Sequence, residues 1–86
     1  MTEFQQTVLR LIAGSQGGRA VSADYIAGSL PGWSRPTARG VLVAHVRRTC
    51  RSLEAAGWIV FWHSRQDQWD NGCASLTEAG RKLLSI

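Results

Sequence analysis

The sequence predicts a small α+β domain in which helices pack around a short antiparallel sheet. Two stretches, one near the N-terminus and one in the middle of the chain, carry apolar residues at helical spacing. A third stretch is aromatic and β-branched, and a polar segment with Asn71-Gly72 separates it from a second apolar run, which is typical of a β-hairpin. The 86 residues, 44% of them apolar, predict a single packed domain over residues 1–86.

The first predicted helix spans residues 2–13. Thr2 is suited to the N-cap position, and Gly14 to the position where the helix ends. The apolar residues of this stretch repeat every three or four positions: Phe4, Val8, Leu11 and Ile12. They predict one buried side for this helix.

A turn and a second helix follow. Gly17-Gly18 is a turn signal, and Ala20-Val21 predicts a very short strand. Ser22 is the expected N-cap of a helix over residues 23–29, with Asp24 in its first turn. The expected apolar side of this helix consists of Tyr25, Ile26 and Leu30.

The third predicted helix is the longest, over residues 37–56, and it ends at Gly57. A start near Val41, after a longer loop, is the alternative, because Gly40 is unfavourable inside a helix. The expected inward seam consists of Val43, Val46, Cys50 and Leu53, flanked by Leu42 and Thr49. The expected outward face consists of Thr37, Gly40, Ala44, Arg47, Arg48 and Arg51.

The C-terminal third predicts a hairpin over residues 58–63 and 73–76, then a short helix over residues 78–84 capped by Thr77. Alternation places Trp58, Val60 and Trp62 on one face of the first strand. Ile59, Phe61 and His63 lie on the other face. Since one face packs on the helices, the other predicts an exposed apolar surface for self-association. The alternative is that a terminal segment covers it.

Charge is distributed unevenly. The net charge is +4, yet residues 25–53 contain no Asp or Glu and five arginines. Arginine makes bidentate contacts to phosphate and guanine, so an acid-free arginine face suits the backbone and major groove of DNA. The alternative is an ordinary solvated helix face.

Two local motifs identify a resemblance. Residues 52–59, Ser-Leu-Glu-Ala-Ala-Gly-Trp-Ile, match a "Leu-Glu-x-x-Gly-apolar-Ile" passage from recognition helix to wing. Residues 76–84, Leu-Thr-Glu-Ala-Gly-Arg-Lys-Leu-Leu, match the "Leu-Thr-x-x-Gly-x-x-x-Leu" passage after the wing. Together they resemble winged helix-turn-helix regulators of the MarR and PadR type. The stretch before Leu53 is longer than in the compact family pattern, and the long terminal helices used there for dimerisation are missing.

The resemblance implies a winged helix-turn-helix fold with three helices, a two-stranded β-wing and a short C-terminal helix. It also implies sequence-specific binding of double-stranded DNA by a small transcription regulator whose third helix enters the major groove. The residues expected to contact DNA are Ser34, Arg35, Thr37, Arg39, Gly40, Ala44, Arg47, Arg48, Arg51 and Arg65. Asp67 and Asp70 oppose the expected wing contact of Arg65.

Other classes of function have little support in the sequence. The His and Cys residues lack the spacing of a zinc site, and nothing arranges a catalytic triad, so we expect no metal, no cofactor and no enzyme. No apolar run approaches the roughly 20 residues that cross a membrane. We expect a cytoplasmic homodimer with Cys50 as a buried thiol. The alternatives are a winged-helix module that binds protein and an accessory subunit of a replication or recombination complex.

Overall fold

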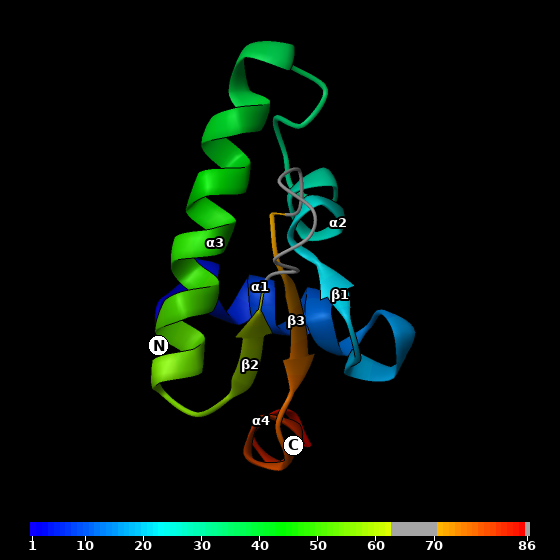
Figure 1. The fold of residues 1–86 in the computed structure, drawn as a ribbon, viewed down its shortest axis with the longest axis vertical. Coiled ribbons are helices and arrows are strands. Elements are labelled where there is room, and N and C mark those ends of the chain that lie inside the picture. The colour runs from blue at the N-terminus through cyan, green and yellow to red at the C-terminus, as the bar shows by residue number, and fades with distance from the viewer. Residues whose placement is uncertain (63–70, 86) are drawn as a thin grey trace.

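The computed structural model describes residues 1–62 and 71–85, and it has an α+β fold with helices around a three-stranded antiparallel sheet (Figure 1). In chain order the elements are α1 (Glu3–Ala13), the 3-10 helix η1 (Gln16–Gly18), β1 (Val21–Ser22), α2 (Ala23–Gly28), the 3-10 helix η2 (Pro36–Ala38), α3 (Arg39–Ala55), β2 (Ile59–Trp62), β3 (Cys73–Leu76) and α4 (Glu78–Leu84). The predicted α+β class and the predicted order of elements are confirmed. The segment from His63 to Asp70, including the expected wing turn, lies outside the described residues.

The sheet has the strand order β1-β3-β2, and both pairs are antiparallel. Ile59 lies opposite Leu76 and Trp62 opposite Cys73, as expected for a hairpin. The short strand β1 pairs with the other edge of β3, with Val21 opposite Ala74. The third strand of the sheet is thus the very short strand predicted at residues 20–21, which the structure places at Val21–Ser22, beside the two strands of the expected hairpin.

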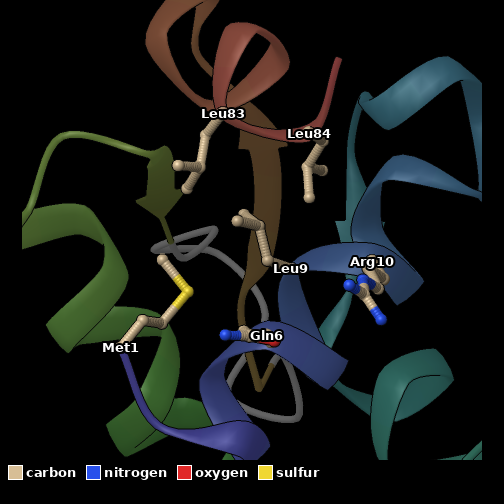
Figure 2. Close-up of a pocket in the computed structure, with 6 residues that line it drawn as sticks. All are labelled: Met1, Gln6, Leu9, Arg10, Leu83 and Leu84. Atoms are coloured by element: carbon tan, nitrogen blue, oxygen red, sulfur yellow. The ribbon is translucent and has the colours of Figure 1, made fainter. Parts of the chain in front are cut away.

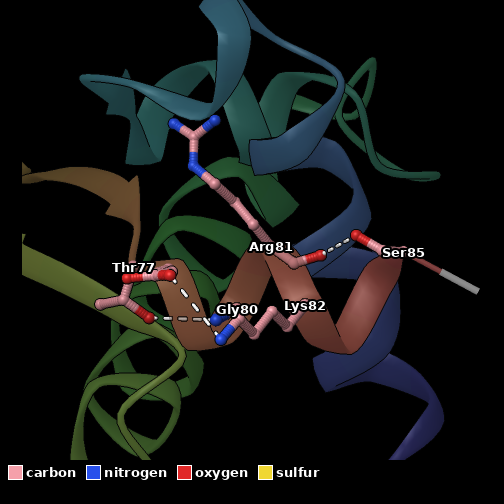
Figure 3. Close-up of polar contacts among 6 residues, drawn as sticks. Thr77, Gly80, Arg81, Lys82 and Ser85 are labelled. Atoms are coloured by element: carbon pink, nitrogen blue, oxygen red, sulfur yellow. Dashed lines mark hydrogen bonds and ion pairs between the residues drawn. The ribbon is translucent and has the colours of Figure 1, made fainter.

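Local capping sets the beginnings of three helices at the predicted residues. The hydroxyl of Thr2 accepts a hydrogen bond from the Gln5 N–H at 3.1 Å, and the Gln5 side chain accepts one from the Thr2 N–H at 2.9 Å. The Ser22 hydroxyl accepts from the Tyr25 N–H at 3.0 Å. At α4 the Thr77 hydroxyl accepts from the Gly80 N–H at 3.1 Å, and Ser85 donates to the Arg81 carbonyl near its end (Figure 3). These bonds satisfy backbone groups that a helix end leaves without intrahelical partners.

The core lies where α1, α2 and α3 meet the inner face of the sheet. Its fully buried side chains include Val8, Leu9, Ile12, Ile26, Val46, Cys50, Leu53 and Ile59. The predicted seam of α3 is confirmed for Val46, Cys50 and Leu53, whereas Val43 is half-buried. The expectation for Tyr25 is wrong, because its side chain is 52% exposed. Tyr25 lies beside the inward Ile26 on a helix of six residues, which has room for only a narrow buried side.

Residues 29–38 connect α2 to α3 and include η2. The helix α3 begins at Arg39, close to the predicted start at residue 37 and before the alternative start at Val41. The stretch between α2 and Leu53 thus consists of this connection and most of α3. In Figure 1 the first turns of α3 extend beyond the sheet, so the beginning of α3 stands clear of most of the fold.

The two motifs that carry the resemblance contact each other through the backbone. Thr77 donates from its hydroxyl to the Gly57 carbonyl at 2.6 Å and from its N–H to the Trp58 carbonyl at 3.1 Å. Gly80 packs directly on the Trp58 carbonyl, where a Cβ atom would have no room. The glycine and threonine of the second motif thus fix α4 against the turn that the first motif makes after α3.

No helix within residues 1–62 and 71–85 combines the length and the apolarity that a bilayer span needs.

Candidate nucleic-acid interface

The outward face of α3 is the principal candidate. Gly40, Ala44, Arg48 and Arg51 are all exposed, as the sequence predicts. Within the described part of the chain, neither the Arg48 nor the Arg51 guanidinium forms a hydrogen bond or an ion pair. Two unneutralised cations therefore lie beside small side chains on one helix face.

Arg47 lies at the edge of this face, and its expected exposed position is wrong, because its side chain is half-buried. Arg47 is seven residues from both Gly40 and Glu54, so it lies between the outward face and the side that carries Glu54. That side faces the sheet, because the Glu54 carboxylate accepts a hydrogen bond from the Phe61 N–H of β2 at 2.8 Å. Arg47 is accordingly half-buried. A helical wheel built on the seam alone does not include the strand that packs along the flank of α3.

Arg39 holds the beginning of α3 against the preceding loop. Its Nε donates to the Trp33 carbonyl at 2.9 Å, and its guanidinium carbon lies 5.3 Å from the centroid of the Trp33 ring. The ring in turn packs over Gly28 at the end of α2. Arg39 remains exposed, but it is engaged within the fold, and sequence reasoning missed Trp33 as its partner.

The remaining predicted residues near the beginning of α3 are exposed. Ser34, Arg35 and Thr37 all lie on the connection between α2 and α3. The backbone of Arg35 is fixed, because its N–H donates to the Gly32 carbonyl at 3.0 Å and its carbonyl accepts from the Ala38 N–H at 2.9 Å. Their side chains are thus available beside the first turn of α3. Arg65 lies outside the described residues.

Val41 is a surface residue that sequence reasoning missed. It is 71% exposed, more than any other large apolar side chain in residues 1–62 and 71–85. It belongs to the first turn of α3, near the exposed Gly40. The sequence indicated this exposure, because Val41 lies between Gly40 and Ala44 in the chain, and both belong to the predicted outward face.

The acids that border the acid-free span are both engaged. Asp24 accepts a hydrogen bond from the Asn71 side chain at 3.0 Å, and Glu54 accepts from the N–H of Phe61. Of the acids in the described ranges, none lies on the outward face of α3 between residues 39 and 53. The positive potential of Arg48 and Arg51 is therefore not offset by a carboxylate on that face.

Two apolar surfaces lie elsewhere. On the outer face of the sheet, Val60 is 50% and Trp62 is 40% exposed, which confirms that one face of β2 is left uncovered by the described residues. Between α1 and α4 there is a hollow of about 300 Å³, into which Leu9, Leu83 and Leu84 point (Figure 2). Met1, Gln6 and Arg10 complete its lining.

His45 and Cys50 are used in packing. The ring of His45 stacks on Phe4 of α1, with centroids 4.0 Å apart. Cys50 is fully buried, and no disulfide joins it to Cys73. In the ranges that the structure describes, no three His, Cys, Asp or Glu side chains are grouped to hold a metal ion.

No protein-family model matches the chain, and neither a curated protein nor a solved structure matches it.

Proposed function

We propose that the protein binds double-stranded DNA with sequence specificity, as a small transcription regulator with a winged helix-turn-helix fold. In this proposal α3 enters the major groove with its outward face toward the bases. The observation that carries it is that face: Arg48 and Arg51 are exposed, without ion pairs in the described residues, and accompanied by small residues. Such a face fits a groove lined with phosphates.

Each predicted contact has a role in this arrangement. Arg48 and Arg51 bind phosphates that border the groove, while Gly40 and Ala44 allow the helix to approach the base edges. Ser34, Arg35 and Thr37 donate to phosphates at the beginning of α3. Arg65, which lies outside the described residues, stays the predicted contact of the wing. Arg39 holds the loop in place, and Arg47 adds positive charge from the flank.

The test is fluorescence anisotropy of labelled DNA across a salt series, with the Arg48→Ala/Arg51→Ala double variant. If both arginines neutralise phosphates, binding weakens and the slope of log K against log salt becomes shallower by about 1.8, that is, two contacts at about 0.9 each. Both side chains are exposed, so the variant keeps the fold.

The matched control is the Arg19→Ala/Lys82→Ala variant. It removes the same two charges from the net charge of +4, but from exposed positions outside α3. It keeps the wild-type slope if the contacts are local to α3. Equal slopes for all three proteins would contradict the assignment of the site.

The mechanism is occupancy: the bound domain blocks or recruits other proteins at its DNA site. We also propose that it acts as a homodimer, because pairing two half-sites increases the affinity and specificity of a small binder. The exposed Val60 and Trp62 support a self-association surface on the sheet. A cytoplasmic location follows from this function.

The same exposed aromatic surface supports a rival function, a module that binds another protein through the sheet. Retention on heparin or on immobilised calf-thymus DNA separates the two. A DNA-binding protein is retained at low salt and elutes as the salt rises. A protein that flows through at low salt favours the rival. An accessory subunit of a replication or recombination complex would be retained too, and only its partners would identify it.

A further inference from the structure

Val41 has no role in the packing of the described residues. Its side chain is 71% exposed on the first turn of a 17-residue helix. A β-branched residue is less favourable than alanine in a helix, and here burial does not offset that disadvantage. The reason for a valine at this position is therefore to be sought in a partner.

Val41 belongs to the same face as Arg48, which forms no ion pair with the described residues. Residues 41, 44 and 48 are separated by three and four positions, which places them in one stripe along the helix. The stripe runs from an isopropyl group through the methyl group of Ala44 to a guanidinium. The space beside it is open, because a Cβ atom on Gly40 would meet nothing within 4 Å.

We propose that Val41 reads a thymine in the major groove, by contact of its methyl groups with the 5-methyl group of the base. This inference rests on the proposed DNA binding by α3. In related docking geometries the first residues of the recognition helix contact base edges, and Val41 is in the first turn. Thymine presents the only methyl group among the four bases in that groove, and an isopropyl group has no hydrogen-bonding atom with which to prefer another base.

The first step of the test is to select bound sequences from a random DNA pool with the wild-type protein. Each thymine of the selected site is then replaced singly by deoxyuridine, which lacks only the 5-methyl group. At one position this replacement weakens wild-type binding about fourfold, the effect of leaving one methyl-sized group unburied. The Val41→Ala protein binds the two DNAs with equal affinity, because its shorter side chain does not reach the methyl group.

Two controls make the result specific. The Tyr25→Ala variant shortens another large exposed side chain, on α2 and outside both proposed surfaces, and keeps the sensitivity to deoxyuridine. At the sensitive position, a C·G pair weakens wild-type binding, and 5-methylcytosine restores part of the loss because it returns the methyl group.

The outcomes distinguish this inference from the function on which it rests. If wild type binds DNA but no thymine is sensitive, or if Val41→Ala keeps the sensitivity, the role of Val41 is overturned and DNA binding stands. If no sequence is enriched and the labelled DNA is not bound, the proposed function and this inference both fall.

Discussion

At the scale of single residues, Cys50 lies on the buried inner side of α3. Its side chain is fully buried between helices and sheet. Burial disfavours the thiolate and raises the pKa of Cys50 from 9.0 to about 12. Because the thiolate is the reactive form, the folded protein protects this sulfur both by excluding reagents and by keeping it protonated.

We therefore expect Cys50 to resist thiol reagents in the folded protein. In a Cys73→Ser variant, where Cys50 is the remaining thiol, Ellman's reagent at pH 8 reacts slowly in buffer and rapidly in guanidinium chloride. The measurement is the release of the coloured thiolate with time. Equal rates in the two conditions would show that the inner side of α3 is open to solvent.

Gly40 and Gly80 are both helical glycines, but their surroundings are opposite. Gly80 is buried on the Trp58 carbonyl and leaves no room for a Cβ atom. Gly40 is exposed, and a Cβ atom there would meet nothing within 4 Å. The fold requires the glycine at position 80. It does not require the one at position 40, where glycine costs about 1 kcal/mol relative to alanine in a helix. The sequence contains both without distinguishing them, because the difference lies in residues distant along the chain.

At the scale of elements, α3 is fixed at both of its ends by contacts to neighbouring segments. At the beginning, Arg39 bonds the Trp33 carbonyl and lies over its ring. At the end, Glu54 accepts from the N–H of Phe61 on the sheet edge. A helix held in this way presents its outward face in one orientation relative to the loop and the sheet, which preorganises the proposed contacts.

The contact at the beginning predicts a difference between two Arg→Lys substitutions. Arg39→Lys keeps the charge but loses the Nε donor and the planar group over Trp33, so we expect the free energy of unfolding to fall by about 1 kcal/mol. Arg35→Lys is the control, since that exposed side chain makes no hydrogen bond or ion pair with the described residues, and it stays within about 0.5 kcal/mol of wild type. Urea unfolding followed by circular dichroism measures both. A loss of the same size in the two variants would indicate that Arg39 does not hold the loop.

The element boundaries were predictable because they depend on local chemistry. Thr2, Ser22 and Thr77 cap helices through hydrogen bonds to residues three positions away, and such pairs can be recognised in a sequence. The half-burial of Arg47 was not predictable in this way, because a helical wheel contains only the residues of α3 and not the segments that pack beside it. The pairing of Arg39 with Trp33 depends likewise on the path of residues 29–38. Periodicity identifies the inner side of a helix but not what packs along its flanks.

At the scale of the whole molecule, the arginine face and the exposed apolar side chains of the sheet lie on different elements. The arginine face lies on α3, while the exposed apolar side chains of β2 lie on the sheet. This separation allows one surface to bind DNA while the other binds a second copy of the chain. Alternation in the sequence predicts which side chains of β2 share the outer face of the sheet. Only the structure shows that the described residues leave Val60 and Trp62 of this face partly exposed.

The self-association surface predicts a specific effect of Trp62. In sedimentation experiments over a range of concentrations, the wild-type protein forms dimers, and Trp62→Gln raises the dissociation constant by about 30-fold, as loss of a buried aromatic anchor does. Tyr25→Gln replaces another exposed aromatic side chain, on α2, and leaves the constant unchanged. A wild-type monomer at all concentrations would contradict the homodimer. An unaffected dimer would exclude the sheet as its interface.

The strand order has a consequence for synthesis of the chain. β3 is the central strand, yet it is made after both of its neighbours. A nascent chain that has reached Trp62 contains the sequences of α1, α2 and α3, but β1 and β2 do not yet have the partner between them. Ile59–Trp62 is a wholly apolar strand, and such strands associate with other chains when their edges are open. Emergence of residues 73–76 from the ribosome is thus the step that closes the sheet.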